Sequence, residues 1–173
     1  MDEAASMKTT EQKTTYAYKT VKTPVGQLNL VASDLGLAAI LWEHDDPKRV
    51  RLSPLAEDKN HPILLETERQ LNDYFDGKRK IFLLKFAPSG TAFQKEVWQV
   101  LSTIPFGETR SYADIARQIN QPKAVRAVGA ANGKNPLSIV VPCHRVIGAN
   151  GKLTGFAGGL ETKAFLLAFE AAK

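Results

Sequence analysis

The chain has 173 residues, of which 43% are apolar and 24% are charged, so it can bury one ordinary core or two small ones and is not expected to be disordered. No apolar run approaches the roughly 18 residues that cross a bilayer, and the polar start has no signal-like segment, so we expect a cytoplasmic or nucleoid-associated protein without a membrane partner. The net charge of +5 lies in the second half, because residues 1–90 carry 13 basic and 13 acidic side chains and residues 91–173 carry 10 and 5; this excess favours a polyanionic partner, although it also occurs on surfaces that bind nothing.

The first half of the sequence predicts a small antiparallel sheet with one helix. Residues 1–15 are polar and are expected to form a flexible segment. Three segments rich in β-forming residues, at 16–21, 27–32 and 37–42, are separated by turn residues. Apolar residues at helical spacing follow at 63–75, before Gly77, and residues 81–86 are a candidate fourth strand.

The turn-forming run Pro88-Ser89-Gly90 predicts a boundary between a supporting domain at residues 16–88 and a second domain at residues 91–173. The second domain predicts mostly helices. Thr91 with Gln94, and Ser111 with Asp114, have the spacing of capping boxes at two helix starts.

A further helix is expected to begin at Pro122 and run to about Asn132, which makes the pair of short helices similar to a helix-turn-helix. Residues 137–141 form a short β-branched element, and a helix over about 160–171 closes the chain. The expected fold is α+β, with a small N-terminal antiparallel sheet-plus-helix domain followed by a mostly helical, winged helix-turn-helix-like domain.

The single cysteine, Cys143, excludes an internal disulfide and a cysteine-rich zinc site. It lies in the run Ile-Val-Val-Pro-Cys-His-Arg-Val-Ile-Gly at residues 139–148. This run resembles the O6-alkylguanine-DNA alkyltransferase family, also called methylated-DNA-protein-cysteine methyltransferases, whose signature is Pro-Cys-His-Arg after an apolar strand. The resemblance covers nearly all of residues 91–170 and residues 16–86 only loosely. It includes Phe93-Gln94, Val97-Trp98, Ile104-Pro105, Gly107, Ser111-Tyr112, Arg126-Ala127-Val128-Gly129, Asn135-Pro136, Gly155, Gly158-Gly159, Lys163 and Glu170.

A lone cysteine is most often a small core residue, but a nucleophilic thiol needs a neighbouring base or positive charge, because its free pKa of about 8.5 leaves it protonated at neutral pH. The resemblance implies a relay of Cys143, water, His144 and Glu170, in which His144 accepts the proton and Glu170 orients the imidazole. Attack on an O-alkyl carbon leaves a thioether that water does not cleave. We therefore expect one irreversible, stoichiometric transfer per molecule, with no cofactor.

A stacked guanine cannot present its alkyl carbon to a buried sulfur, so the nucleotide must be flipped out of the duplex. On a helix, Arg126 shares a face with Gly129, Ala130 and Gly133. A smooth face around one long cation suits minor-groove binding with Arg126 inserted into the stack, as the resemblance implies; Ala127 belongs to the same expected contact. The alternative is that the small residues permit tight helix packing and Arg126 is solvated.

The resemblance also implies a substrate pocket. Tyr112 would donate a hydrogen bond to the flipped guanine and crowd its phosphate, although it is otherwise an ordinary half-buried tyrosine. Asn135, before Pro136, would fix the turn that leads to the active-site strand. A loop at residues 155–159 would recognise the base with backbone groups near Val146 and Ala157, beside Phe156, Gly158 and Lys163. Phe156 replaces the tyrosine of many members and so lacks its hydroxyl, and Lys163 is either part of the site or a solvated charge.

No metal is predicted, because His44 and His61 are isolated in polar segments and some relatives place a structural zinc on cysteines that this chain lacks. Trp42 and Trp98 lie among apolar neighbours and are expected in the core. The expected partner is double-stranded DNA containing O6-alkylguanine, bound by a monomer, with cooperative binding left open. Two other functions remain: a noncatalytic protein that binds alkylated lesions, and a cysteine hydrolase, which would need an oxyanion hole.

Overall fold

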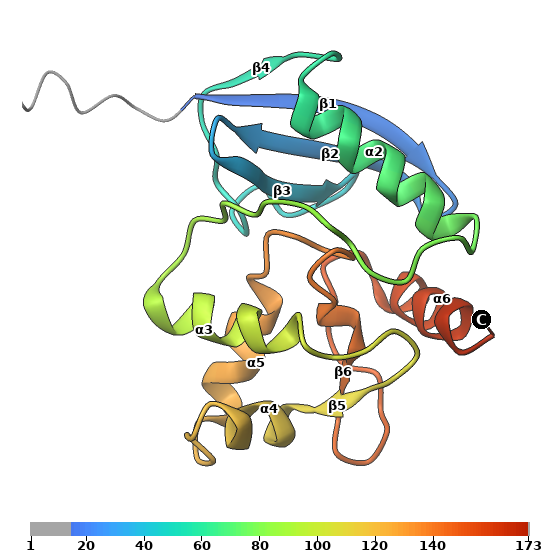
Figure 1. The fold of residues 1–173 in the computed structure, drawn as a ribbon. Helices are drawn as coiled ribbons and strands as arrows, with labels where there is room; N and C mark the ends of the chain where they lie inside the picture. Colours follow the sequence, from blue (N-terminus) through green and yellow to red (C-terminus); the bar gives the residue numbers. More distant parts are fainter. Residues whose placement is uncertain (1–14, 173) are drawn as a thin grey trace, which may run out of the picture.

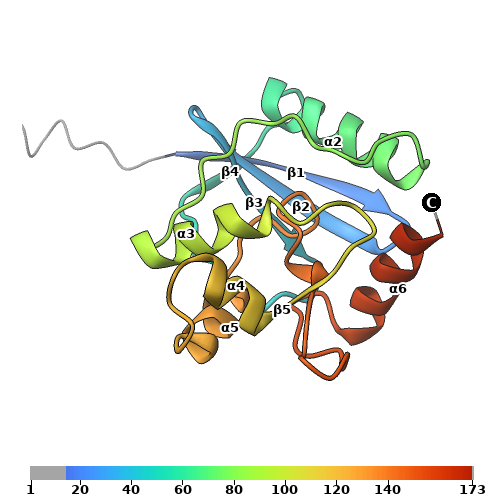
Figure 2. The same ribbon diagram turned by 60° about the horizontal axis from the view of Figure 1, so that its bottom comes forward.

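The computed structural model describes residues 15–172, so residues 1–14 of the predicted flexible N-terminal segment lie outside the described residues. The described chain has an N-terminal part, in which one helix covers a sheet, and a C-terminal part built mainly of helices (Figure 1). The views in Figures 1 and 2 place the helices of the C-terminal part beyond the β3 edge of the sheet. The predicted α+β class is confirmed.

The sheet has four strands in the order β3-β2-β1-β4. The strands β1 (Tyr16–Thr23), β2 (Gly26–Ser33) and β3 (Gly36–Trp42) form the predicted antiparallel meander. The short β4 (Leu55–Glu57) adds to β1 in the parallel direction. Sequence reasoning missed β4, because three exposed residues have no apolar alternation.

Helix α2 (Pro62–Phe75) covers one face of the sheet. Its start follows from local chemistry, since Pro62 is at the first position and the His61 ring accepts a hydrogen bond from the Ile63 amide. Leu64, Leu71 and Tyr74 are buried on the inner side of α2. This burial confirms the predicted helix at residues 63–75.

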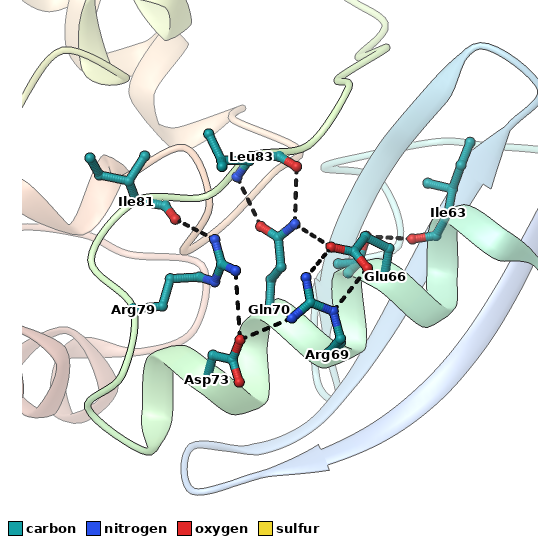
Figure 3. Close-up of polar contacts among 9 residues, drawn as sticks. Ile63, Glu66, Arg69, Gln70, Asp73, Arg79, Ile81 and Leu83 are labelled. Carbon is teal, nitrogen blue, oxygen red and sulfur yellow. Dashed lines mark hydrogen bonds and ion pairs between the residues drawn. The ribbon is translucent and has the colours of Figure 1, made fainter.

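The predicted fourth strand at residues 81–86 is wrong. Ile81 and Leu83 alternate with more buried neighbours, but their side chains are 70% and 74% exposed, and only Phe86 forms an isolated bridge. The Gln70 side chain takes the place of a partner strand: it accepts from the Leu83 amide at 2.9 Å and donates to the Leu83 carbonyl at 3.0 Å (Figure 3). The alternation of exposed and buried residues therefore belongs to an extended segment that the Gln70 side chain attaches to α2, and not to a strand of the sheet.

The outer edge of β3 is covered by two other segments of the chain. The Leu37 amide donates to the Lys85 carbonyl at 2.8 Å, and the Ile40 amide donates to the Pro136 carbonyl at 2.8 Å. The first contact needs Gly36, where a Cβ atom would stand 2.6 Å from the Lys85 oxygen. The edge strand thus has partners, and the sheet is joined to the segment that precedes Cys143.

Both predicted capping boxes are present in the C-terminal part. Thr91 and Gln94 begin α3 (Ala92–Leu101), and Ser111 and Asp114 begin α4 (Tyr112–Gln118). Helix α5 (Val125–Gly133) begins three residues later than Pro122 would predict, because the Ala124 amide closes a turn on the Gln121 carbonyl. Helix α6 (Leu160–Ala171) has the predicted bounds.

The strands β5 (Arg110–Ser111) and β6 (Val146–Ile147) pair in parallel and join the start of α4 to the segment after Cys143. Trp42 and Trp98 are buried as expected, and each indole N–H has a partner, the Ser138 hydroxyl for Trp42 and the Ala131 carbonyl for Trp98. Between residues 15 and 172, no helix combines the length and apolar character that a membrane span requires.

Candidate active site

Cys143 opens a single turn of 3-10 helix, η1 (Cys143–Arg145), and is 4% exposed. The expected active-site strand at residues 137–141 is absent. Tight turns replace it, closed by hydrogen bonds from the Val140 and Val141 amides, and Ile139 has a φ of 77°. A β-branched residue in this region is strained and needs surrounding structure to hold it. The apolar run was interpreted as a buried strand because the residues of this turn are as buried as those of a strand inside a protein core.

Asn135 holds this turn. Its side-chain amide donates to the Val141 carbonyl at 2.9 Å, and its carbonyl accepts from the Leu137 amide at 3.0 Å. The same side chain lowers the pKa of the Cys143 thiol against the larger, opposing effect of burial. Asn135 therefore ties the two ends of the turn together and favours the ionised form of the thiol that follows it.

His144 and Glu170 form the buried pair that the family resemblance implied. His144 Nε2 lies 2.8 Å from Glu170 Oε2, and their side chains are 0% and 1% exposed. His144 Nδ1 is buried and has no hydrogen-bond partner among the described residues. A carboxylate accepts hydrogen bonds only, so the proton of a neutral His144 lies on Nε2 and Nδ1 is free to accept another.

The resting site holds a thiol beside a neutral imidazole. Burial raises the pKa of Cys143, and the Asn135 side chain and the charges of Arg49 and Lys163 oppose this shift. Burial also lowers the pKa of His144 against the opposing effect of Glu170. Both shifts favour the uncharged forms, so this part of the structure combines a protonated thiol with an imidazole that can accept a proton.

Sequence reasoning gave no role to two further partners of Glu170. Arg145 donates from Nε to Oε1 at 2.8 Å and from Nη2 to Oε2 at 2.9 Å, and Tyr74 Oη donates to Oε2 at 2.5 Å. Although burial opposes ionisation, these bonds and the one from His144 hold the pKa of Glu170 well below its usual range. Arg145 is part of the Pro-Cys-His-Arg signature, so the sequence could have indicated a role for it. Tyr74 could be recognised only as a residue on the apolar face of a helix.

Lys163 is fully buried rather than solvated. Its ammonium group donates to the Val146 carbonyl at 2.6 Å and to the Thr154 carbonyl at 3.1 Å. The Thr154 hydroxyl is also 2.6 Å from the Tyr112 hydroxyl. Lys163 and Tyr112 therefore fasten the loop at residues 148–159 from two sides, one from α6 and one from α4.

The far end of the 148–159 loop rests on the N-terminal part. The Phe156 ring meets the Trp42 ring edge-on at 5.4 Å between centroids, and a Cβ atom at Gly158 would stand 2.7 Å from the indole. A cavity of about 230 Å³ beside this contact is lined by Trp42, Ala157 and Gly158, among others. Only glycine allows such a close approach to Trp42.

Arg126 lies exposed on α5 and makes no ion pair among residues 15–172. Ala127 and Ala130 are exposed beside it, whereas Gly129 is half-buried, and a Cβ atom there would make ordinary contact with the Tyr112 ring at 3.8 Å. The expected small-residue face of α5 therefore serves partly for helix packing and partly as open surface. Arg126 and Cys143 come from separate elements, and no described contact joins them.

Arg49, in the loop after β3, also escaped sequence reasoning. It forms two hydrogen bonds of 2.7 Å with the Asp45 carboxylate and donates to the Asn135 carbonyl at 2.7 Å. It also donates to the Gly133 carbonyl at the end of α5 at 3.3 Å. The N-terminal part thus supports the turn that holds Cys143.

Within the described residues, no three His, Cys, Asp or Glu side chains are grouped as metal ligands.

The chain matches known proteins along almost its whole length. Residues 92–172 match the family described as 6-O-methylguanine DNA methyltransferase, DNA binding domain, and residues 16–88 match the ribonuclease-like domain of the same methyltransferase. A methylated-DNA--protein-cysteine methyltransferase of Methanosarcina mazei is 49% identical over 153 residues, which cover 88% of this chain and 96% of the relative. The constitutive methylated-DNA--protein-cysteine methyltransferase of Bacillus subtilis is 48% identical over 158 residues, with 88% and 94% covered.

The fold is also similar to that of a solved structure. The crystal structure of Mycobacterium tuberculosis OGT in complex with DNA superposes with a TM-score of 0.83 at 42% identity, covering 91% of this chain and 93% of the other. The likeness extends over both the sheet and the helices, so the two parts of this chain are arranged as in that protein.

Proposed function

The chain belongs to the 6-O-methylguanine DNA methyltransferase family, and on this premise we propose that it moves the alkyl group of O6-alkylguanine in double-stranded DNA onto the sulfur of Cys143. It is a DNA-binding methyltransferase that repairs DNA by alkyl transfer. The observation that carries the assignment of Cys143 is its position: the sole cysteine of the chain directly precedes a buried imidazole whose far nitrogen is held by a carboxylate.

The transfer needs one proton movement before carbon is attacked. The Cys143 thiol gives its proton, through a bridging water, to His144 Nδ1, while Nε2 keeps its hydrogen bond to Glu170. The ionised carboxylate stabilises the imidazolium that forms, as in other activated nucleophiles with an orienting third group. The Asn135 amide and the Lys163 charge favour the thiolate in the same step.

The sulfur then attacks the alkyl carbon. A sulfur–carbon bond forms as the carbon–oxygen bond breaks, and the electron pair of the broken bond leaves on the guanine oxygen. The base takes up one proton and His144 releases the one that it received, so ordinary guanine is restored and the thiol hydrogen has been replaced by the alkyl group. Water does not cleave the thioether product, and within residues 15–172 there is no second thiol to accept the alkyl group, so each molecule acts once.

The lesion reaches Cys143 by nucleotide flipping. Arg126, which is exposed at the start of α5, enters the stack from the minor groove and fills the space that the base leaves. The small residues Ala127 and Ala130 allow the helix to approach the narrow groove. Lys123 and Lys134 are exposed at the two ends of α5 and add attraction for phosphates.

The flipped guanine lies between Tyr112 and the 148–159 loop. Backbone groups near Val146 and Ala157 read its edge, and the Tyr112 hydroxyl, now bonded to Thr154, turns to the base. Lys163 keeps the Val146 and Thr154 carbonyls in place. A monomer in the cytoplasm, acting at the nucleoid, suffices for this reaction, since every group in it belongs to one chain.

A noncatalytic lesion-binding protein would use the same helix pair without an acceptor, and the presence of Cys143 argues against it. A cysteine hydrolase would need hydrogen-bond donors preorganised around an oxyanion. Mass spectrometry separates the three functions. After incubation with duplex DNA containing O6-methylguanine, the peptide with Cys143 should gain one CH₂ (about 14 Da), with yield limited by the amount of protein.

The matched variant is Cys143→Ala, which should bind the lesion and transfer nothing. If this variant still removes the methyl group, another acceptor exists and the assignment fails. If the wild-type protein cleaves more substrate than its own molar amount, it turns over and the hydrolase alternative holds.

A further inference from the structure

Tyr74 joins the N-terminal part directly to the active site. It lies near the C-terminal end of α2, which both ribbon views place next to α6 (Figures 1 and 2). Its hydroxyl donates to Glu170 Oε2 at 2.5 Å, the same oxygen that lies 2.8 Å from His144 Nε2. Two residues from different parts of the chain therefore share one acceptor atom.

Surrounding aromatic rings hold the Tyr74 ring in an orientation that points its hydroxyl at Glu170. The side chain is 0% exposed and is surrounded by four aromatic rings with centroids 5.0 to 6.0 Å away, those of Phe75, Phe82, Phe106 and Phe169. An all-phenylalanine cluster would fill this space equally well. A buried hydroxyl costs free energy unless it is bonded, so the role of the oxygen lies in its bond to Glu170.

We propose that Tyr74 is a positioning residue for alkyl transfer, which acts through Glu170 to keep His144 neutral and oriented to receive the proton of Cys143. This inference rests on the proposed function of Cys143. Glu170 Oε2 accepts from His144, Tyr74 and Arg145. Each donor draws electron density from the oxygen, and the Tyr74 hydroxyl thereby limits how strongly the carboxylate stabilises a charged imidazole.

Other groups around His144 set the background for this effect. Those that face it are Glu170 and Lys163 from α6, Arg145 and Cys143 from η1, and Tyr74, through Glu170, from α2. Burial lowers the pKa of His144, and Arg145 and Lys163 act in the same direction, whereas Glu170 raises it. Removal of the Tyr74 hydroxyl strengthens the one group that raises this pKa, so His144 would become charged, and unable to accept a proton, at a higher pH.

The test is single-turnover methyl transfer from duplex DNA containing O6-methylguanine, followed between pH 5 and 9 for the wild type and Tyr74→Phe. We expect unchanged DNA affinity and an acid limb of the pH–rate profile that is displaced to higher pH. The variant should be slower by about threefold to tenfold below neutral pH, since the net effect of one ordinary hydrogen bond is of this order, and nearer to the wild type at pH 9. The control Tyr18→Phe removes a hydroxyl from the separate cluster around Val31 and Ala39 and should match the wild type.

A second variant covers the case in which Tyr74→Phe does not fold. Replacement of Tyr74 by 3-fluorotyrosine keeps the ring and makes the hydroxyl a stronger donor, so the acid limb should move to lower pH. Unmoved acid limbs overturn the inference, and so does a loss of rate by one factor at every pH, because a loosened fold would give that result. Mass spectrometry of the wild type keeps the two proposals apart: if Cys143 is not methylated the proposed function fails, and if it is methylated while the limbs stay in place only the role of Tyr74 fails.

Discussion

Replacing Glu170 by glutamine should destabilise the protein strongly, because it leaves a buried cation without its counter-charge. Glu170 and Arg145 have side chains that are 1% and 6% exposed, and the guanidinium bonds to both carboxylate oxygens. Removing one partner of a buried ion pair costs about 3 to 5 kcal/mol. In a chain of this size each kcal/mol lowers the melting temperature by about 2 to 4 °C, so we expect a fall of about 6 to 20 °C.

The loss should also depend on pH in a defined direction. The folded protein holds the pKa of Glu170 well below its usual value, so the carboxylate contributes stability that is present above the pKa of the unfolded chain, about 4.3. That contribution is lost as the pH falls through the lower, folded pKa. Urea unfolding of wild type and Glu170→Gln should give a full difference in free energy at pH 7 and a shrinking one below about pH 4.

Glu96 on α3 provides the matched control. Its side chain is exposed, so Glu96→Gln should change the unfolding free energy by less than about 0.5 kcal/mol. A difference below about 1 kcal/mol for Glu170→Gln at pH 7, or one that stays constant down to pH 3, would contradict the account of Glu170 as the charge that balances Arg145.

Two further variants test the DNA-binding and loop-holding roles. Arg126→Ala should slow repair of duplex DNA by tenfold or more, because the flipped nucleotide loses an interaction that offsets part of the few kcal/mol that flipping costs. The reaction with free O6-alkylated guanine should hardly change. Equal losses in the two assays would refute insertion. Lys163→Met should leave the Val146 and Thr154 carbonyls without their donor, cost about 1 to 3 kcal/mol in urea unfolding and slow methyl transfer at saturating DNA, whereas a stable variant of normal rate would show that the loop holds itself.

The elements that local chemistry specifies were predicted well. The capping boxes of Thr91 and Ser111 are satisfied by neighbours three residues away. Such signals need no distant partner. The strand predictions at residues 81–86 and 137–141 were wrong because a strand depends on a distant partner. Apolar character and alternation along the chain do not reveal whether a hydrogen-bonding strand lies alongside.

The candidate site also combines features that the sequence indicated with others that depend on distant parts of the chain. The sequence identified Cys143 as a candidate nucleophile, and the resemblance carried by Pro-Cys-His-Arg implied His144 as the base and Glu170 as the orienting carboxylate. Only the tertiary structure brought in Tyr74 and Arg49, which reach Glu170 and Asn135 across separations of 96 and 86 residues. The sequence by itself determined which groups can react, whereas the packing of the sheet against the helices decided how they are charged and held, because pKa values and hydrogen bonds depend on neighbours in space and not along the chain.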